Sequence, residues 1–326
     1  MRHLKNLFYR LSILVLLVMT SPVFAAAQGV PKKRAITFWG FLMRPKFIVM
    51  LTIAAIVLVL LLSKKMKNSI KIPILLLSTF LFGIAANLPV KLFSSFSMHP
   101  SPVCAVAKAM LYGFRIPMIV TLAVILFLTI IGPKLFCGWI CPIGALQELI
   151  AMLADKLKIK RIKWNFSVSQ FIRLGIFILF IFLSGTAILH ITNQERVIPI
   201  AFYDYLNAFH GFEIEWQKNI LDNIIHFLPF ILTVILSFKL YRPFCYFVCP
   251  IGIFTHLLEQ VSLFRVTLKR PPCDDCNVCI IKSPCPVVPD ILKNASLRPD
   301  CFSCNICIES CPKDALEFGI KKTLSA

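Results

Sequence analysis

The sequence predicts an α-helical integral membrane bundle of about five to six transmembrane helices, followed by a small α+β domain at the C-terminus. Three observations predict this class. Of the 326 residues, 58% are hydrophobic and only 15% are charged, a balance typical of membrane proteins. Apolar runs long enough to cross a bilayer recur along the chain, and most of the cysteines lie after residue 244.

Residues 1–28 have a basic start, an apolar middle and a small-residue exit at Ala25 to Ala27. This pattern predicts either a secretory signal peptide or an uncleaved N-terminal anchor. Residues 29–270 are predicted to form the transmembrane bundle, because backbone polar groups in lipid must be satisfied within each helix. Its apolar runs lie at about 47–62, 72–90, 116–133, 170–190 and 220–240.

Lys and Arg outnumber Asp and Glu by 35 to 15. Because the basic residues gather at the ends of apolar runs, they indicate contact with anionic lipid, and no nucleic acid is expected as a partner. The loop after the 116–133 run is basic and the 191–219 loop is acidic, so the C-terminal tail is predicted to be cytoplasmic. A multi-pass location in the bacterial inner (cytoplasmic) membrane follows, although the basic residues between 32 and 46 disagree with this orientation. The basic residues that support it are Lys64, Lys65, Lys67, Lys71, Lys134, Lys156, Lys158, Lys160, Arg161, Lys163, Arg242, Arg265, Lys269 and Arg270.

Two cysteine motifs fill the predicted tail domain, residues 271–326. The second, CFSCNICIESCP, has the C-x2-C-x2-C-x3-C-P spacing of bacterial ferredoxins, and the first, CDDCNVCIIKSPCP, lengthens its last gap to five residues. Such a loop directs three thiolates at one [4Fe-4S] cluster, and the other motif supplies the fourth. The predicted ligands are Cys273, Cys276, Cys279 and Cys311, called tail site 1, and Cys285, Cys301, Cys304 and Cys307, called tail site 2.

Other uses of these cysteines fit less well. Structural zinc sites rarely use three cysteines at consecutive two-residue gaps, and a disulfide framework does not suit a tail that faces a reducing compartment. Over about residues 271–318 the tail resembles the two-cluster ferredoxin module. That resemblance implies a ferredoxin-like α+β unit that passes one electron at a time between two [4Fe-4S] clusters.

A second cysteine pattern is an internal repeat, FCGWICPIG at 136–144 and FCYFVCPIG at 244–252, each after a basic residue and an apolar run. A helical Cys-x3-Cys segment places both sulfurs on one face, and the following proline fits a helix start. Its cysteines, called the repeat site, are Cys137, Cys141, Cys245 and Cys249. They predict a further metal centre or two thiol–disulfide couples, and ordinary packing of buried cysteines is the alternative. The segments after each pair are predicted to lie along the inner membrane surface.

Outside these motifs, Met98, His99 and Cys104 share a loop that the orientation places on the external side. Thioether, imidazole and thiol groups would suit a copper or iron site, and an ordinary proline-rich turn is the alternative. His190 and His226, toward the outer ends of their helices, are weaker candidates for contact with a quinone or a haem.

Two FCxxxCPIG motifs after transmembrane helices, followed by paired ferredoxin motifs, resemble the polyferredoxin-type membrane proteins of anaerobic respiration. These include the quinol-oxidising ferredoxin-type subunit of periplasmic nitrate reductase systems and the membrane protein that supports nitrous oxide reductase. The resemblance covers about residues 110–318. The chain lacks room for the external flavin domain of the latter and has no C-x-x-C-H motif, so neither covalent flavin nor attached haem is expected.

The resemblance implies a membrane-bound iron–sulfur protein that moves electrons between the quinone pool or a cytoplasmic donor and a respiratory reductase or its partner. Expected partners are a reductase subunit, a cytochrome or a ferredoxin, and quinone is a further candidate cofactor. No catalytic residue is predicted, and quinol oxidation by the chain itself stays open. The alternative is a maturation or metal-handling factor that supplies electrons for metal or thiol reduction during assembly of a respiratory enzyme.

Overall fold

Helices make up most of the part of the chain that the computed structural model describes. The described residues are 37–88, 93, 95–98, 101–112, 115–189, 202, 206–212, 220–269, 273–293 and 300–320. The predicted signal or anchor, His99, His190 and most of the 191–219 loop lie outside these residues.

Among the described residues, three helical segments are long and apolar enough to cross a membrane: α4 (Pro45–Leu62), the segment Asn68–Asn87, and Phe166–Ser184 within α10 (Phe166–Leu189). The segment Asn68–Asn87 consists of α5 (Asn68–Thr79), a π-helical turn η1 (Phe80–Ile84) and η2 (Ala85–Asn87). Two shorter apolar segments are α8 (Ile116–Ile131) and His226–Ser237 within α12 (Ile220–Ser237). The apolar runs of the sequence therefore form helices, as expected of a membrane protein.

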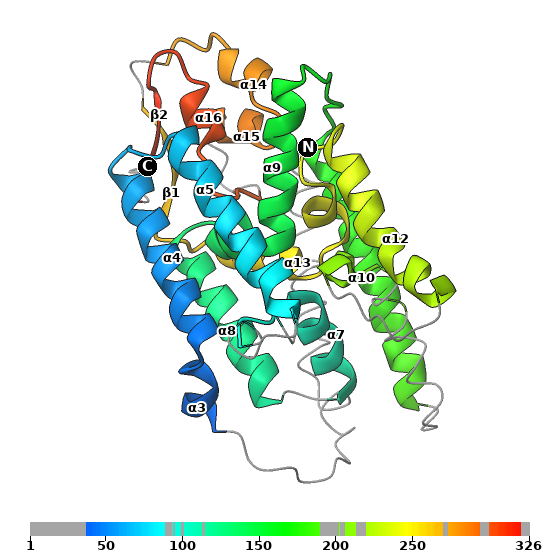
Figure 1. Cartoon of the computed structure of the whole chain (residues 1–326). Helices are drawn as coiled ribbons and strands as arrows, with labels where there is room; N and C mark the ends of the chain where they lie inside the picture. The colour runs from blue at the N-terminus through cyan, green and yellow to red at the C-terminus, as the bar shows by residue number, and fades with distance from the viewer. Residues whose placement is uncertain are drawn as a thin grey trace.

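Shorter elements connect these helices. They are α3 (Phe38–Leu42), α7 (Pro102–Tyr112), η3 (Phe136–Ile140), α9 (Pro142–Lys156), η4 (Ala208–Phe212), η5 (Phe244–Val248) and α13 (Ile251–Glu259). In Figure 1, α3 and α7 lie at one end of the bundle and the tail elements at the other, beside the end of α9.

The tail is built on a two-stranded antiparallel sheet of β1 (Phe264–Leu268) and β2 (Leu316–Ile320). Three short helices lie between the strands in the chain, α14 (Val278–Lys282), α15 (Val288–Leu292) and α16 (Ile306–Glu309). Val266 and Phe318 are paired in register and both are buried, which fixes the sheet on the core. Since β1 precedes residue 271, the sheet joins the end of the bundle to the tail.

The prediction that the segments after the repeat lie on the membrane surface was wrong. Helix α9 is largely buried and packs along α5 and α12, and α13 packs on α8 and α7. Two polar residues of α9, Gln147 and Glu148, are fully buried and have hydrogen-bond partners inside the protein.

Three cations counted for orientation also lie in the interior. Lys71, Lys134 and Arg242 are at most 1% exposed and form ion pairs. They therefore do not report on lipid head groups. The orientation predicted from positive charge still rests, at this end of the molecule, on the exposed residues Lys156, Lys158, Lys160 and Lys163.

Candidate metal centres

The two Cys-x3-Cys segments have the same backbone conformation. Each forms a π-helical turn, η3 or η5, in which the N–H of the second cysteine donates to the carbonyl five residues before it. The turns end at Cys141 (φ −60°, ψ 121°) and Cys249 (φ −64°, ψ 117°), and proline follows at the start of α9 and α13. The sequence repeat is therefore a structural repeat. π-helical turns are rare and are frequently found at functional sites.

The structure brings all four cysteines of the repeat site together around one small cavity. Lys134 and Pro102 also line it, and the rest of the lining is Phe136, Phe209, Phe244, Ile251, Gly252 and Phe302. Gln147 donates from Nε2 to the sulfur of Cys245 at 3.2 Å. Burial raises the pKa of all four thiols, and proximity to one another adds to this for Cys137, Cys141 and Cys249. Such thiols ionise readily only when a metal binds them.

Buried guanidinium groups hold the two loops in matching ways. Arg242 donates from Nη1 to the Cys137 carbonyl at 3.1 Å, and Arg173 on α10 donates from Nη1 to the Cys245 carbonyl at 3.2 Å. Glu148 forms ion pairs with Arg242 and Lys71, and Asp300 forms ion pairs with Arg173 and Lys134. Each loop is thus fixed by a cation that a buried carboxylate holds.

In the tail, the cysteines of tail site 1 line one cavity at the edge of the molecule, and Cys276 is exposed. Their motif has left-handed residues at Asp275 and Asn277, and the other motif has them at the equivalent Ser303 and Asn305. These positive φ angles wind both loops in the same way.

Tail site 2 is more deeply placed than tail site 1. Burial and the nearby charge of Cys304 raise the pKa of Cys285 to about 12. Burial and proximity to Cys304 also raise the pKa of Cys301 and of Cys307. Cys307 is also close to Cys279 of tail site 1, because α14 and α16 are in contact. Cys273, Cys276, Cys279 and Cys311 thus line one cavity, and the contact between α14 and α16 brings Cys307 close to it.

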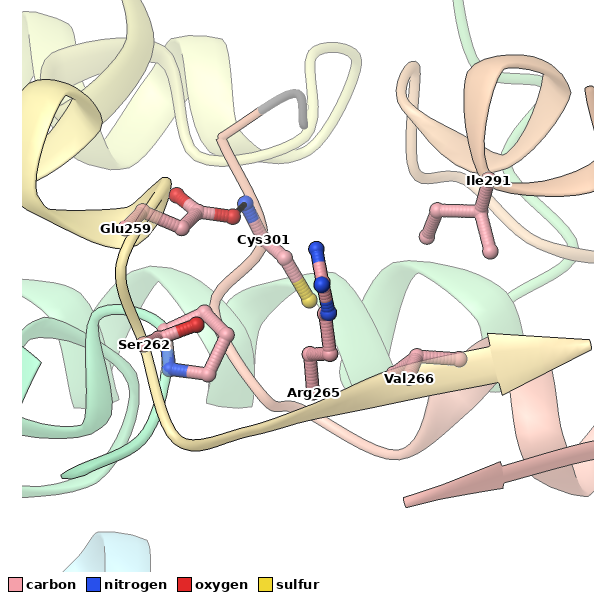
Figure 2. A pocket seen from close by; sticks show the side chains of 7 residues that line it. Glu259, Ser262, Arg265, Val266, Ile291 and Cys301 are labelled. Carbon is pink, nitrogen blue, oxygen red and sulfur yellow. Dashed lines mark hydrogen bonds between the residues drawn. The ribbon is translucent and has the colours of Figure 1, made fainter. Parts of the chain in front are cut away.

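Polar side chains lie around Cys301 of tail site 2. Figure 2 shows Cys301 beside Arg265 and Glu259 in the lining of a small cavity. Glu259 accepts a hydrogen bond from the Cys301 N–H at 2.9 Å. This carboxylate therefore fixes the backbone of the first cysteine in the CFSC loop.

The loop 300–304 joins tail site 2 to the repeat site. Phe302 follows Cys301 and lines the repeat-site cavity. Trp139 of the first repeat loop donates to the Ser303 carbonyl at 3.1 Å, and Tyr246 of the second donates to the Asp300 carbonyl at 3.1 Å. The tail is thus docked into the repeat.

Of the predicted external residues, His99 lies outside the residues that the structure describes. Cys104 is partly buried on α7, two residues after Pro102, and Met98 packs on the core. The His226 ring lies 5.5 Å from that of His210 on η4. Sequence reasoning missed Glu148, Arg173, Asp300 and Gln147. Glu148 and Arg173 could have been found from the sequence, because each is a charged residue within an apolar helical segment.

The residues fit iron–sulfur clusters. Each of the three groups offers four thiols, and the repeat-site lining holds no carboxylate, which suits a thiolate-ligated cluster in an apolar shell. Structural zinc would accept four thiols as well.

Comparisons with known proteins identify the class. Residues 114–160 and 223–271 match the family described as a 4Fe-4S binding domain, and these ranges contain the four repeat-site cysteines. The chain is 31% identical to the uncharacterized protein MJ0750 of Methanocaldococcus jannaschii over 216 residues, 65% of this chain and 83% of that protein.

Two named relatives are more distant. Ferredoxin-type protein NapH of Haemophilus influenzae is 29% identical over 49% of this chain and 54% of its own length. Protein NirI of Paracoccus denitrificans is 28% identical over 55% of this chain and 26% of its own length. No solved structure matches the chain. The chain therefore belongs to the polyferredoxin-type family of 4Fe-4S membrane proteins.

Proposed function

We propose that the chain is an electron relay with three iron–sulfur centres in series: tail site 1, tail site 2 and the repeat site. The carrying observation is the succession of three four-cysteine groups, with Cys279 near Cys307 and Phe302 between tail site 2 and the repeat-site cavity. A cluster bound at each group would take up and release one electron at a time. The protein's own groups bury the centres and hold their spacing.

The relay would connect a cytoplasmic donor, or the quinone pool, with a respiratory reductase or its partner. The exposure of Cys276 makes tail site 1 the contact for a soluble redox protein on the cytoplasmic side. The domain boundaries and the inner-membrane orientation predicted from the sequence are part of this proposal.

Iron analysis tests the relay. Protein purified without oxygen should contain about twelve irons and twelve acid-labile sulfides, and Cys137→Ser or Cys249→Ser should remove about four of each. The variant Cys104→Ser should leave the iron content unchanged. A wild-type content of about eight irons would leave only the tail centres, and stoichiometric zinc without iron would contradict the proposal.

Access for quinone is supported by an apolar groove of about 300 Å³ between α12 and η5. Leu232, Pro243 and Phe247 line it, and Phe244 lines both this groove and the repeat-site cavity. A quinol in the groove would therefore lie one side chain from the repeat site. Leu232→Trp should slow reduction of the clusters by added quinol about tenfold or more, which corresponds to a rise of about 1.4 kcal/mol in the activation barrier.

The matched control is Leu179→Trp, at an exposed leucine on α10 outside the groove. Equal slowing in both variants, or in neither, would remove the groove from the route.

The maturation alternative is favoured by one observation, that α7 begins beside the repeat site at Pro102 and carries Cys104. Electrons leaving the repeat site there could reduce a metal ion or a disulfide near Cys104. If Cys104→Ser abolishes electron delivery to such an acceptor while quinol still reduces the clusters, the maturation role replaces the respiratory one.

A further inference from the structure

Lys134 and Arg242 occupy the same position in the two repeats, three residues before the first cysteine of each loop. Both have a left-handed backbone, with φ of 44° and 51°, and their exposed fractions are 1% and 0%. Glycine would adopt this backbone more easily. The interactions of the Lys134 and Arg242 side chains must therefore offset the conformational cost.

The two cations lie at the repeat site and close to one another. Lys134 lines the cavity, and Arg242 reaches from the second repeat to the Cys137 and Gly138 carbonyls of the first. Lys134 Nζ is 5.0 Å and Arg242 Cζ 4.6 Å from the centre of the Phe302 ring, which lies in the same cavity wall.

The charges of the two ion-pair groups do not cancel. Asp300 holds Lys134 and Arg173, and Glu148 holds Lys71 and Arg242, which makes four cations against two carboxylates. The buried Glu259, whose carboxylate lies within 4.8 Å of Asp300, adds a third carboxylate, so the cations still outnumber the carboxylates. His256 also contacts Asp300, at 2.9 Å, and burial lowers its pKa, so it adds no charge near neutral pH. A buried excess of positive charge is unfavourable unless an anionic group lies nearby. Cysteine thiolates on a metal centre would be that group.

We propose that Lys134 and Arg242 are the positioning residues that balance the negative charge of the centre at the repeat site and raise its reduction potential. This inference rests on the proposed function, since it requires a redox centre there. Reduction adds one negative charge to the centre, and a nearby buried cation stabilises the added charge more than it would in water.

The test is a redox titration, followed by electron paramagnetic resonance, of the purified full chain. Lys134→Met and Arg242→Met should each shift the reduction equilibrium of the repeat-site centre at least tenfold toward the oxidised form, about 59 mV lower in potential for one electron. Lys134→Arg and Arg242→Lys keep the charge and should restore the wild-type potential to within about threefold in the equilibrium. Arg242 itself shows that arginine fits this backbone position.

Lys46→Met is the matched control, because Lys46 is another buried cation but lies on α4 and donates to the Ser97 carbonyl. Its loss should leave the potential unchanged. If Lys134→Met does not retain the tail clusters, Lys134→Gln takes its place, since the amide still donates to Asp300 without the charge.

The iron content distinguishes a failure of the proposed function from a failure of this inference alone. A wild-type protein with iron only in the tail sites would overturn the repeat-site centre itself, and this inference with it. A full iron content with an unchanged potential in the charge-removing variants would overturn the role of Lys134 and Arg242 alone.

Discussion

At the residue scale, glycine at 138 allows the tail to approach the first repeat loop. A Cβ on Gly138 would lie 2.2 Å from the Phe302 carbonyl oxygen, a distance that no packing tolerates. The second repeat has Tyr246 at the equivalent position, where it donates to the Asp300 carbonyl instead. The two loops therefore differ where they contact the tail and agree where they hold cysteines.

Gly138→Ala should displace the loop that carries Phe302 and lower thermal stability in detergent by about 1–3 kcal/mol, the usual cost of overpacking. Gly175→Ala on α10 is the control, because its Cβ meets nothing within 4 Å. Alanine is the better helix former, so this variant should be neutral or slightly more stable. Equal melting temperatures for the two variants would show that the loop does not make this close contact.

At this scale the sequence predicted three cysteine groups, two of which each line one cavity, but it predicted none of the buried partners of Lys134 and Arg242. Cysteine spacing is local and reports on its ligand directly. The partners Asp300 and Glu148 lie 166 and 94 positions away from Lys134 and Arg242, as the residue numbers give by subtraction. No local pattern relates residues so far apart.

At the element scale, helix α9 connects the repeat site to the bundle through Glu148. Burial by itself would raise the pKa of this carboxyl, but Lys71, Arg242 and the Tyr241 hydroxyl outweigh burial and hold its pKa at about 2. The carboxylate joins α5, α9 and the start of the second repeat loop.

The depressed pKa of Glu148 has a consequence for acid stability. Its contribution is fully present above the unfolded pKa of about 4.5 and is lost as pH falls toward 2. Glu148→Gln should reduce stability at pH 7 by about 3–5 kcal/mol, because Lys71 and Arg242 lose their charged partner. Thermal unfolding of both proteins between pH 7 and pH 3 checks this, since the variant should lack that part of the acid dependence.

A matched surface pair provides the control for Glu148. Asp274 and Lys313 form an ion pair at 2.5 Å in which both side chains are about half exposed. Asp274→Asn should change stability by less than about 1 kcal/mol, the usual range for exposed pairs. A similar loss in Asp274→Asn and Glu148→Gln would argue against a special role for the buried network.

At the scale of the whole molecule, the proposed relay requires that each tail motif supplies one cysteine to the cluster of the other motif. Cys311 lies with the first motif's three cysteines and Cys285 with the second motif's three. The sheet and the α14–α16 contact bring the motifs together in this crossed arrangement.

Cys311→Ser should therefore weaken or remove the cluster at tail site 1, while Cys285→Ser should affect tail site 2. Electron paramagnetic resonance distinguishes the two, because tail site 1 is near the surface and its signal should respond to an added soluble relaxing agent. If Cys311→Ser removes the shielded signal and keeps the accessible one, the crossed assignment is wrong.

The sequence by itself determined the class of the molecule, the helical segments and the three sets of cysteines, because hydropathy and ligand spacing are local properties. Only the tertiary structure decided that the four repeat cysteines share one cavity, that Phe302 lies in its wall, and that α9 packs inside the bundle. It also showed that Lys71, Lys134 and Arg242, which the sequence suggested were charges facing the membrane surface, form buried ion pairs. The physical reason is that a charge at the end of an apolar run can meet either lipid head groups or a distant carboxylate. Which of the two it meets depends on how the helices pack.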